Sequence, residues 1–264
     1  HKDKFEQNLS TILQYNIELP LKKEGAEFIN NFTPKVALMY SPNKSKNLSS
    51  DNRRMDTSNI YSLNRIANNE TVEGGASLTY GTIFSKTNKE TNRNTLNFEI
   101  ASLLRINENP DLSTSSTIGQ KMSDLFGNIE LYPNENLSLK YNFSIDNNFD
   151  KTNYDSISTK FIINKFVTSF EYSDEKNNLI NESFTSNSSS FEIDKNNSIN
   201  FNTRRNNEKS ATEFYNLIYS YKNDCLVASI KFNKEFYKDS DLEPEKEIFF
   251  TLSLIPFGGV TTEN

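Results

Sequence analysis

A strict alternation of apolar and polar residues constrains the fold of this chain more than any other feature of its sequence. In the segment 137–146 every second residue is apolar: Leu137, Leu139, Tyr141, Phe143 and Ile145. The residues between them are polar or charged. Successive side chains of a β-strand point to opposite faces of a sheet, so this segment predicts a strand with one apolar and one polar face.

The same alternation recurs along the chain and predicts an all-β fold of about thirteen strands, with end points uncertain by a few residues. Many of them are near ten residues long, which spans roughly 25 Å in a tilted strand, the height of an outer-membrane apolar band. The predicted strands are 11–19, 34–41, 72–85, 95–104, 124–132, 137–146, 156–163, 165–173, 188–194, 198–203, 211–221, 225–237 and 247–256.

The connections between these strands alternate between long and short. The longer ones are rich in Asn, Ser, Thr, Lys and Glu, and they are 42–71, 105–123, 147–155, 174–187, 204–210 and 238–246. The connections that alternate with them are moderate or short, and they are 20–33, 86–94, 133–136, 164, 194–197 and 222–224. Short turns on one side and long loops on the other are typical of an antiparallel transmembrane β-barrel. If the C-terminus is periplasmic, the short turns are periplasmic and the long loops are external.

Composition narrows the choice of partners and chemistry. The chain has 20 Phe, 12 Tyr and no Trp, with 34% hydrophobic residues, which suits strands with one wetted face. A net charge of −6 argues against nucleic acid as the main partner. No apolar run is long enough for a transmembrane helix, although barrels span without one. The single histidine, His1, and single cysteine, Cys225, support no metal cluster, catalytic triad or cofactor site, so no enzymatic activity is expected.

The register of the strand 225–237 follows from the cost of burying a charge in lipid. If the row from Leu226 to Phe232 faces lipid, Lys231 faces the lumen; the opposite register costs about 2–4 kcal/mol near the midplane. The same alternation predicts that polar residues of this strand and of 137–146 line a wet lumen: Ser138, Lys140, Asn142, Ser144, Lys231 and Asn233.

Several segments together resemble the LptD family, outer-membrane proteins that assemble lipopolysaccharide (LPS). They are "NLSSDNRRMDTSNIYSLNRI" followed by "VEGGASLTYG", then "SDLFGNIELYPNENLSLKYNFSID", and "NDCLVASIKFNKEFYKDSDLEPEKEIFFTLSLIPFGG". The resemblance runs roughly from Phe32 to Gly259 and rests on the order and spacing of these pieces. It implies that 1–264 is the C-terminal part of a barrel of roughly 26 strands. The periplasmic jelly-roll domain and the first barrel strands would be absent, leaving an open half.

The resemblance also implies a function and partners. The family passes LPS from periplasmic bridge proteins, which its N-terminal domain contacts, into the outer leaflet, and a plug lipoprotein, LptE, fills the lumen. The strand 247–256 would form one side of a lateral gate, through Phe250, Thr251, Leu252, Ser253 and Leu254. Cys225 matches a position that the family uses for a disulfide to its periplasmic domain. Some members carry two adjacent cysteines there, whereas this chain has Leu226 second.

The family motif includes Asn64, Arg65, Glu73, Gly74 and Gly75. Asn64 and Arg65 could line a glycolipid path, but bracing of the long loop is the better interpretation, because an arginine inside a lumen needs hydrogen-bond partners. The Glu73-Gly74-Gly75 run lacks the spacing of a phosphate-binding loop and indicates a bulge or a close backbone approach.

Two other classes remain open at this point. The strand pattern is shared with general porins and with TonB-type receptor barrels, which only the motif resemblance argues against. A secreted soluble β-sandwich or adhesin that binds glycans would need both sheets to share one dry core, which the weak aliphatic content and the segregated loops disfavour.

Overall fold

The computed structural model describes residues 10–236 and 246–254. Within them the chain forms strands joined by turns and loops, with one short 3₁₀ helix, η1 (Thr117–Gly119). The strands are β1 (Leu13–Glu18), β2 (Leu21–Glu24), β3 (Phe28–Ser41), β4 (Gly75–Asn88), β5 (Arg93–Arg105), β6 (Leu125–Asn134), β7 (Leu137–Ile145), β8 (Thr152–Ile163), β9 (Phe166–Lys176), β10 (Asn181–Glu192), β11 (Asn197–Asn206), β12 (Ala211–Lys222), β13 (Leu226–Glu235) and β14 (Lys246–Leu254).

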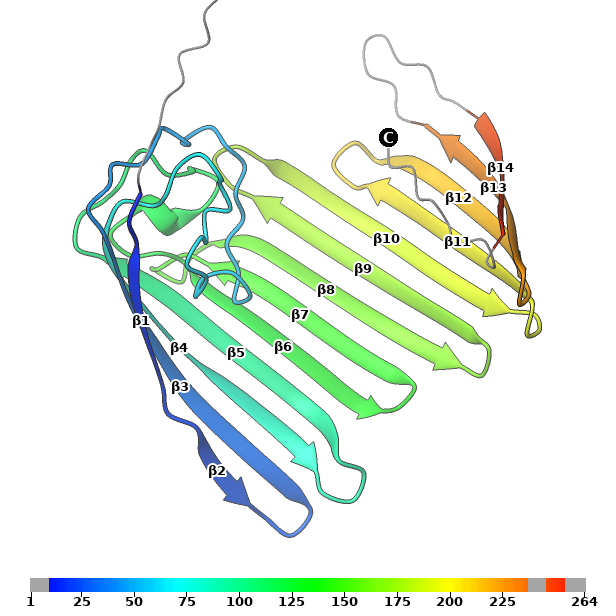
Figure 1. Cartoon of the computed structure of the whole chain (residues 1–264), viewed down its shortest axis with the longest axis horizontal. Coiled ribbons are helices and arrows are strands. Elements are labelled where there is room, and N and C mark those ends of the chain that lie inside the picture. The colour runs from blue at the N-terminus through cyan, green and yellow to red at the C-terminus, as the bar shows by residue number, and fades with distance from the viewer. Residues whose placement is uncertain (1–9, 237–245, 255–264) are drawn as a thin grey trace, which may run out of the picture. The chain divides into compact units, whose positions relative to one another are not determined.

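The fourteen described strands belong to one sheet, in the order β1-β3-β4 and then consecutively to β14, with β2 paired to β3 (Figure 1). Where the register is defined, the pairing is antiparallel, as between β3 and β4 and between β12 and β13. The all-β, antiparallel prediction is therefore confirmed. Among the described residues no helix is long and apolar enough to cross a bilayer.

The prediction of a loop at 20–33 is wrong. The chain continues through Pro20 into β2, turns, and enters β3 at Phe28. The amide of Leu19 donates to the carbonyl of Pro34 at 3.1 Å, but Pro34 has no N–H to donate in return. This missing bond falls where the edge strand is interrupted between β1 and β2. Pro20 and the polar residues after it interrupt the alternation of apolar and polar residues, so β2 was not recognised from the sequence.

The predicted loops 147–155 and 174–187 are also too long. β8 begins at Thr152 and β10 at Asn181, so the connections shrink to 146–151 and 177–180. β10 reads NESFTSNSSSFE and carries Ser, Thr or Asn on both faces, so it has no apolar row to detect. β4 begins at Gly75 rather than at residue 72. The predicted loop 238–246 falls almost wholly in 237–245, outside the described residues, as do positions 255–256 of the last predicted strand.

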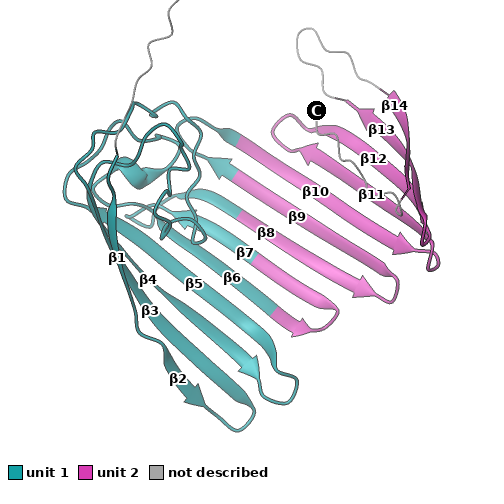
Figure 2. Ribbon diagram, in the orientation of Figure 1, with its two compact units in different colours: residues 1–131, 141–155, 175–181 teal, residues 132–140, 156–174, 182–264 magenta. Residues whose placement is uncertain are grey.

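The chain divides into two compact units (Figure 2). Unit 1 contains β1–β5, the long loops 42–74 and 106–124, and residues 125–131, 141–155 and 175–181. Its core is formed where these loops fold onto one face of β5 and β6. The loops contribute Leu48, Met55, Ile60, Ile66, Leu112 and Ile118, and the strands contribute Ala101, Leu103 and Phe126.

Unit 2 contains 132–140, 156–174 and the chain from 182 onward. One face of its last three strands is an exposed apolar surface, because the register sets large side chains side by side. Leu217 of β12 lies opposite Phe232 of β13, and Ile230 of β13 lies opposite Phe250 of β14. All four are at least 37% exposed. The other face carries Ser229, Lys231 and Asn233 in the alternate positions.

Candidate functional site

A buried ion-pair network lies where loop 42–74 meets the end of the sheet in unit 1. Arg65, from the loop, grips Glu73 with two parallel hydrogen bonds, Nε to Oε2 at 2.6 Å and Nη2 to Oε1 at 2.5 Å. The remaining Arg65 donors reach β4, with Nη2 to Ser77 Oγ at 2.6 Å and Nη1 to Thr79 Oγ1 at 3.0 Å. This bidentate geometry is the strongest that an arginine and a carboxylate form.

Arg105, the last residue of β5, completes the network from the other side. Its Nη2 donates to Oε1 of Glu73, so one carboxylate joins two guanidinium groups. Its Nε donates to the carbonyl of Ile118 at 2.6 Å, and its Nη1 donates to the carbonyl of Gly74 at 3.2 Å. We call Arg65, Glu73, Ser77, Thr79 and Arg105 the buried arginine cluster. It ties loops 42–74 and 106–124 to β4 and β5.

Burial makes the pairing within this cluster obligatory. Glu73 is 1% exposed, Arg65 5% and Arg105 3%. Burial lowers the pKa of Arg65 to about 9, which still leaves its guanidinium charged at neutral pH. Removing water from a charge is costly unless an opposite charge and hydrogen bonds replace it. Each guanidinium donor named above has an acceptor within the protein, so the cluster is suited to bracing rather than to binding a ligand.

The two loops are also fastened directly to each other. Ser45 Oγ accepts from the amide of Gly74 at 2.9 Å and from Asn109 Nδ2 at 3.0 Å. The amide of Leu48 donates to the carbonyl of Asp111 at 2.6 Å. Loops that share hydrogen bonds and a core move as one body, and Figure 1 shows them gathered at one end of β3–β5.

Tyr61 connects loop 42–74 to β1, β3 and β4. Its carbonyl accepts from Gln14 Nε2 of β1 at 2.8 Å, and Lys35 Nζ of β3 lies 4.6 Å from its ring centroid. A side chain at Gly81 would collide with the Tyr61 hydroxyl, so only glycine lets the ring lie against β4. Burial, with the charges of Glu99 and Glu18, raises the pKa of Tyr61.

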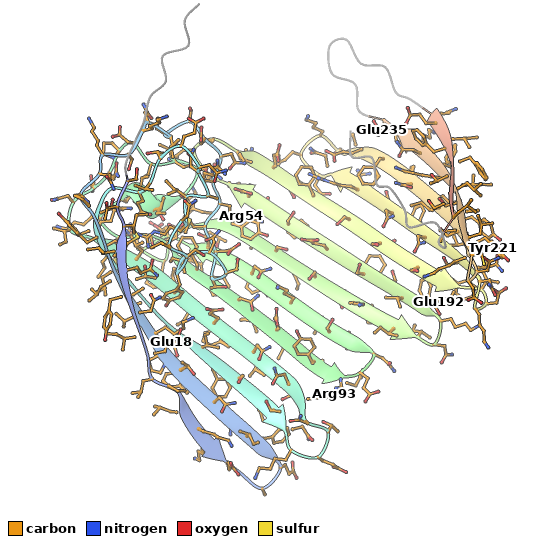
Figure 3. The ribbon with its side chains drawn as sticks, viewed as in Figure 1. Glu18, Arg54, Arg93, Glu192, Tyr221 and Glu235 are labelled. Carbon is orange, nitrogen blue, oxygen red and sulfur yellow. The ribbon has the colours of Figure 1, made fainter. Side chains whose placement is uncertain are left out.

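Arg54 reaches from the same loop toward the second half of unit 1 (Figure 3). Its guanidinium carbon lies 4.3 Å from the ring centroid of Tyr154 in β8, and its Nη1 lies 3.7 Å from Glu175 Oε2 of β9. Loop 42–74 therefore contacts strands from β1 to β9 within unit 1.

Only some of the predicted family-motif residues contact one another. Arg65 and Glu73 are partners, and Gly74 is packed so closely on the carbonyl of Asn43 that a Cβ would not fit there. Gly75 has φ +94°, a conformation that disfavours other residues. Asn64 stays exposed and donates to the carbonyl of Asn68 at 3.1 Å, outside the cluster.

Ser144 and Asn142, two of the predicted lumen residues, lie in polar contacts of unit 1. Ser144 Oγ donates to Asp124 Oδ2 at 2.6 Å, which also accepts from Asn153 Nδ2 at 2.8 Å. Asn142 Oδ1 accepts from Asn128 Nδ2 at 2.6 Å. Asn142 thus links β7 to β6, while Asp124, just before β6, joins the ends of β7 and β8.

The other predicted lumen residues lie in unit 2. Ser138 and Lys140 border a hollow of about 600 Å³, together with Lys160 and Arg204. Lys231 Nζ lies 5.7 Å from the ring centroid of Phe249. Asn233 is buried and donates to Glu235 Oε1 at 2.9 Å.

Cys225 and the predicted gate strand lie at the end of the chain. Cys225 is an exposed free thiol in the turn before β13, and its amide donates to Asn223 Oδ1 at 3.0 Å. The gate residues Phe250, Thr251, Leu252, Ser253 and Leu254 are all exposed and belong to β14, the last strand in the sheet order. Cys225 and this strand belong to unit 2, whereas the buried arginine cluster belongs to unit 1.

Sequence reasoning missed Arg105 and Asp124. Arg105 closes the run ASLLR, where an arginine follows two leucines at a strand end, and that was the available signal. Asp124 was the first residue of the predicted strand 124–132, and nothing in the sequence set it apart. In the part of the chain that the structure describes, no group of three His, Cys, Asp or Glu side chains is placed to hold a metal ion.

Comparisons with known proteins complete the description. Among curated proteins nothing matches. Similar solved structures include the siderophore receptor PirA from Acinetobacter baumannii, with a TM-score of 0.42 and 10% identity over 91% of this chain. This chain spans about half of that receptor, 47% of its length. Another is OmpT, an outer membrane protein of Vibrio cholerae, with a TM-score of 0.31 and 10% identity over 95% of this chain and 98% of that one. Scores this low carry no argument about function.

The match to a protein family is decisive. The profile described as "LptD: LPS transport system D" covers residues 7–224, most of the chain. It includes the loop that carries Arg65 and Glu73 and the strand that ends in Arg105. The chain is an outer-membrane protein and belongs to the LptD family.

Proposed function

We propose that this chain is the C-terminal part of a barrel that inserts LPS into the outer leaflet of the outer membrane. The family match over residues 7–224 carries the proposal. The exposed apolar face of β12–β14, with polar residues on the opposite face, supports a wall between lipid and a wet interior. No enzymatic step is proposed, because transport of a lipid needs a surface and a path rather than a reacting group.

In the orientation we propose, the turns 135–136, 164–165, 193–196 and 223–225 and the C-terminus are periplasmic, while loops 42–74 and 106–124 are external. Short periplasmic turns and long external loops are the rule for such barrels. The buried arginine cluster then holds the external loops against the strand ends, and the polar face carrying Ser138, Lys140 and Lys231 lines the lumen.

The proposed partners follow from the same orientation. A plug lipoprotein of the LptE type would occupy the lumen, and periplasmic LPS-bridge proteins would act through an N-terminal domain of the parent protein. β14 would form one side of the lateral exit. Cys225, in a proposed periplasmic turn and exposed, would form a disulfide with a thiol of that N-terminal domain.

Depletion of the full-length parent protein tests this function. We expect newly made LPS to stop reaching the cell surface, measured by modification with an outer-leaflet enzyme, while an unrelated barrel still assembles. Continued arrival of new LPS at the surface after depletion would refute the proposal.

A further inference from the structure

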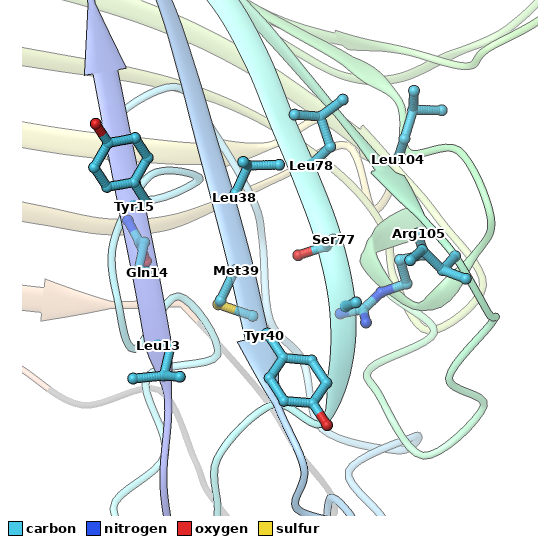
Figure 4. A pocket seen from close by; sticks show the side chains of 12 residues that line it. Leu13, Gln14, Tyr15, Leu38, Met39, Tyr40, Ser77, Leu78, Leu104 and Arg105 are labelled. Carbon is cyan, nitrogen blue, oxygen red and sulfur yellow. The ribbon is translucent and has the colours of Figure 1, made fainter.

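An apolar hollow of about 590 Å³ opens on the sheet face opposite the buried arginine cluster, across β1, β3, β4 and β5 (Figure 4). Strand alternation separates the two features. Met39, Ser77 and Arg105 point under the loops and are at most 5% exposed, whereas their neighbours Leu38, Tyr40 and Leu104 are at least 37% exposed. The hollow therefore belongs to the outward face.

Register gives the hollow its shape. One row runs Tyr15–Leu38–Leu78–Leu104, each residue opposite the next on the adjoining strand. The parallel row, nearer the long loops, has a small residue in the middle, because Ala76 lies opposite Tyr40 and the amide of Ile106 donates to its carbonyl at 3.2 Å. The Ala76 methyl group is much smaller than the side chains of Tyr40 and Ile106 on either side, so a depression forms between them. The first row bounds this depression on the side away from the long loops.

The lining fixes the chemistry of the occupant. On this face the hollow presents leucine, isoleucine, alanine and tyrosine side chains, and the one arginine of the lining turns its guanidinium to the other face. Apolar surface this exposed would be costly in water, at about 25 cal/mol per Å². The outer membrane supplies hydrocarbon instead, and the surface is continuous with the outward row of β1 and β3.

We propose that this hollow holds an acyl chain of LPS on the outer wall of the barrel. The choice of LPS over phospholipid rests on the proposed function and orientation, since a hollow beside the external loops faces the outer leaflet. Tyr40, in the row nearer the external loops, places its hydroxyl group at that rim of the hollow (Figure 4), where amphipathic rings sit at the headgroup level. The hollow belongs to unit 1 and β14 to unit 2, so the lipid would lie beside the external loops rather than on the exit strand itself.

The test uses the full-length parent protein in phosphatidylethanolamine vesicles that contain purified LPS. A photo-crosslinking amino acid, p-benzoylphenylalanine, replaces Leu38, and a control protein carries it at Ile157 of β8, an exposed apolar residue in a strand that does not pair with β14. We expect an LPS adduct at position 38 well above that at 157. Ala76→Phe should fill the hollow and lower the adduct by about tenfold, the effect of losing contact with roughly two methylene groups. Ala228→Phe, which enlarges another outward-facing alanine, should leave it unchanged.

Three results would overturn the proposal: equal LPS adducts at 38 and 157, adducts with phospholipid alone, or an adduct yield that Ala76→Phe leaves unchanged. Heat-modifiable migration checks that each variant folds. If Ala76→Phe does not fold, Ile106→Ala removes one wall of the hollow instead, and an unchanged yield would count against the site. No transport occurs in these vesicles, so a negative result leaves the depletion test of the proposed function independent.

Discussion

Glu73→Gln in the full-length parent protein is the sharpest perturbation of the buried arginine cluster. The substitution keeps the size of the side chain and removes the one carboxylate shared by two arginines, whose side chains are 2% and 0% exposed. Removing one partner of a buried ion pair costs about 3–5 kcal/mol, because the remaining charge is left unpaired. Since 1.4 kcal/mol is a factor of ten, the population with loop 42–74 released should rise roughly 10²–10³-fold.

Limited trypsin digestion measures that population, because cleavage follows the open fraction when opening is fast. Arg53 and Arg54 lie in the loop and provide the cleavage sites. The matched control is Glu70→Gln, the same change in the same loop at an ion pair to Lys46 that is 3.2 Å long and half exposed or more. An exposed pair of this kind is worth about 0–1 kcal/mol, so its cleavage rate should hardly change.

Equal cleavage rates for the two variants would refute this reasoning. A second variant tests whether the cluster stabilises the loop by pairing its charges or by its hydrogen bonds. Replacing the whole network, with Arg65→Met, Glu73→Leu and Arg105→Met, removes the unpaired charges and should restore much of the protection lost in Glu73→Gln. If the triple variant is cleaved faster still, the cluster stabilises the loop through its hydrogen bonds rather than by mutual charge compensation.

The remaining predictions concern other parts of the sheet. Gly127→Ala should destabilise the parent barrel by about 1–3 kcal/mol, because a Cβ there collides with the Phe143 ring, and Phe143→Leu should recover part of the loss in a heat-modifiability assay; additive losses would count against the clash. Cys225→Ser should abolish a mobility shift of the parent protein on non-reducing gels, and free alkylation of Cys225 in the folded parent would contradict the disulfide. In intact cells an impermeant maleimide should label Lys209→Cys but not Lys165→Cys, since the two lie in connections at opposite ends of the strands; the reverse pattern would invert the orientation.

Much of the fold was predictable because lipid and water impose opposite demands on successive residues. β7 and β13 alternate cleanly, and their strands were found within a residue or two. β2 and the first half of β10 were missed, because one follows a proline and the other is polar on both faces. Alternation reports a difference between faces, so a strand without that difference gives no signal.

The site was predictable only where one residue type implied a partner. A lone Arg65 in a long loop suggested bracing, and Glu73 stood close by in the motif. Arg105 could not be linked to them, because its approach depends on the pairing of β4 with β5 and on the path of loop 106–124. The hollow beside Ala76 was equally hidden, since it arises from four strands placed in register.

The same network has a consequence for how the strands find their alignment. Alternation distinguishes inside from outside, but it is blind to a slip of two residues, which returns every side chain to its own face. A slip of that size between β4 and β5 would move Arg105 by about 6.6 Å along the sheet, beyond the reach of Glu73. Such a misaligned hairpin would bury charges without partners. The contact between Glu73 and Arg105 thus penalises a slip that the apolar pattern tolerates.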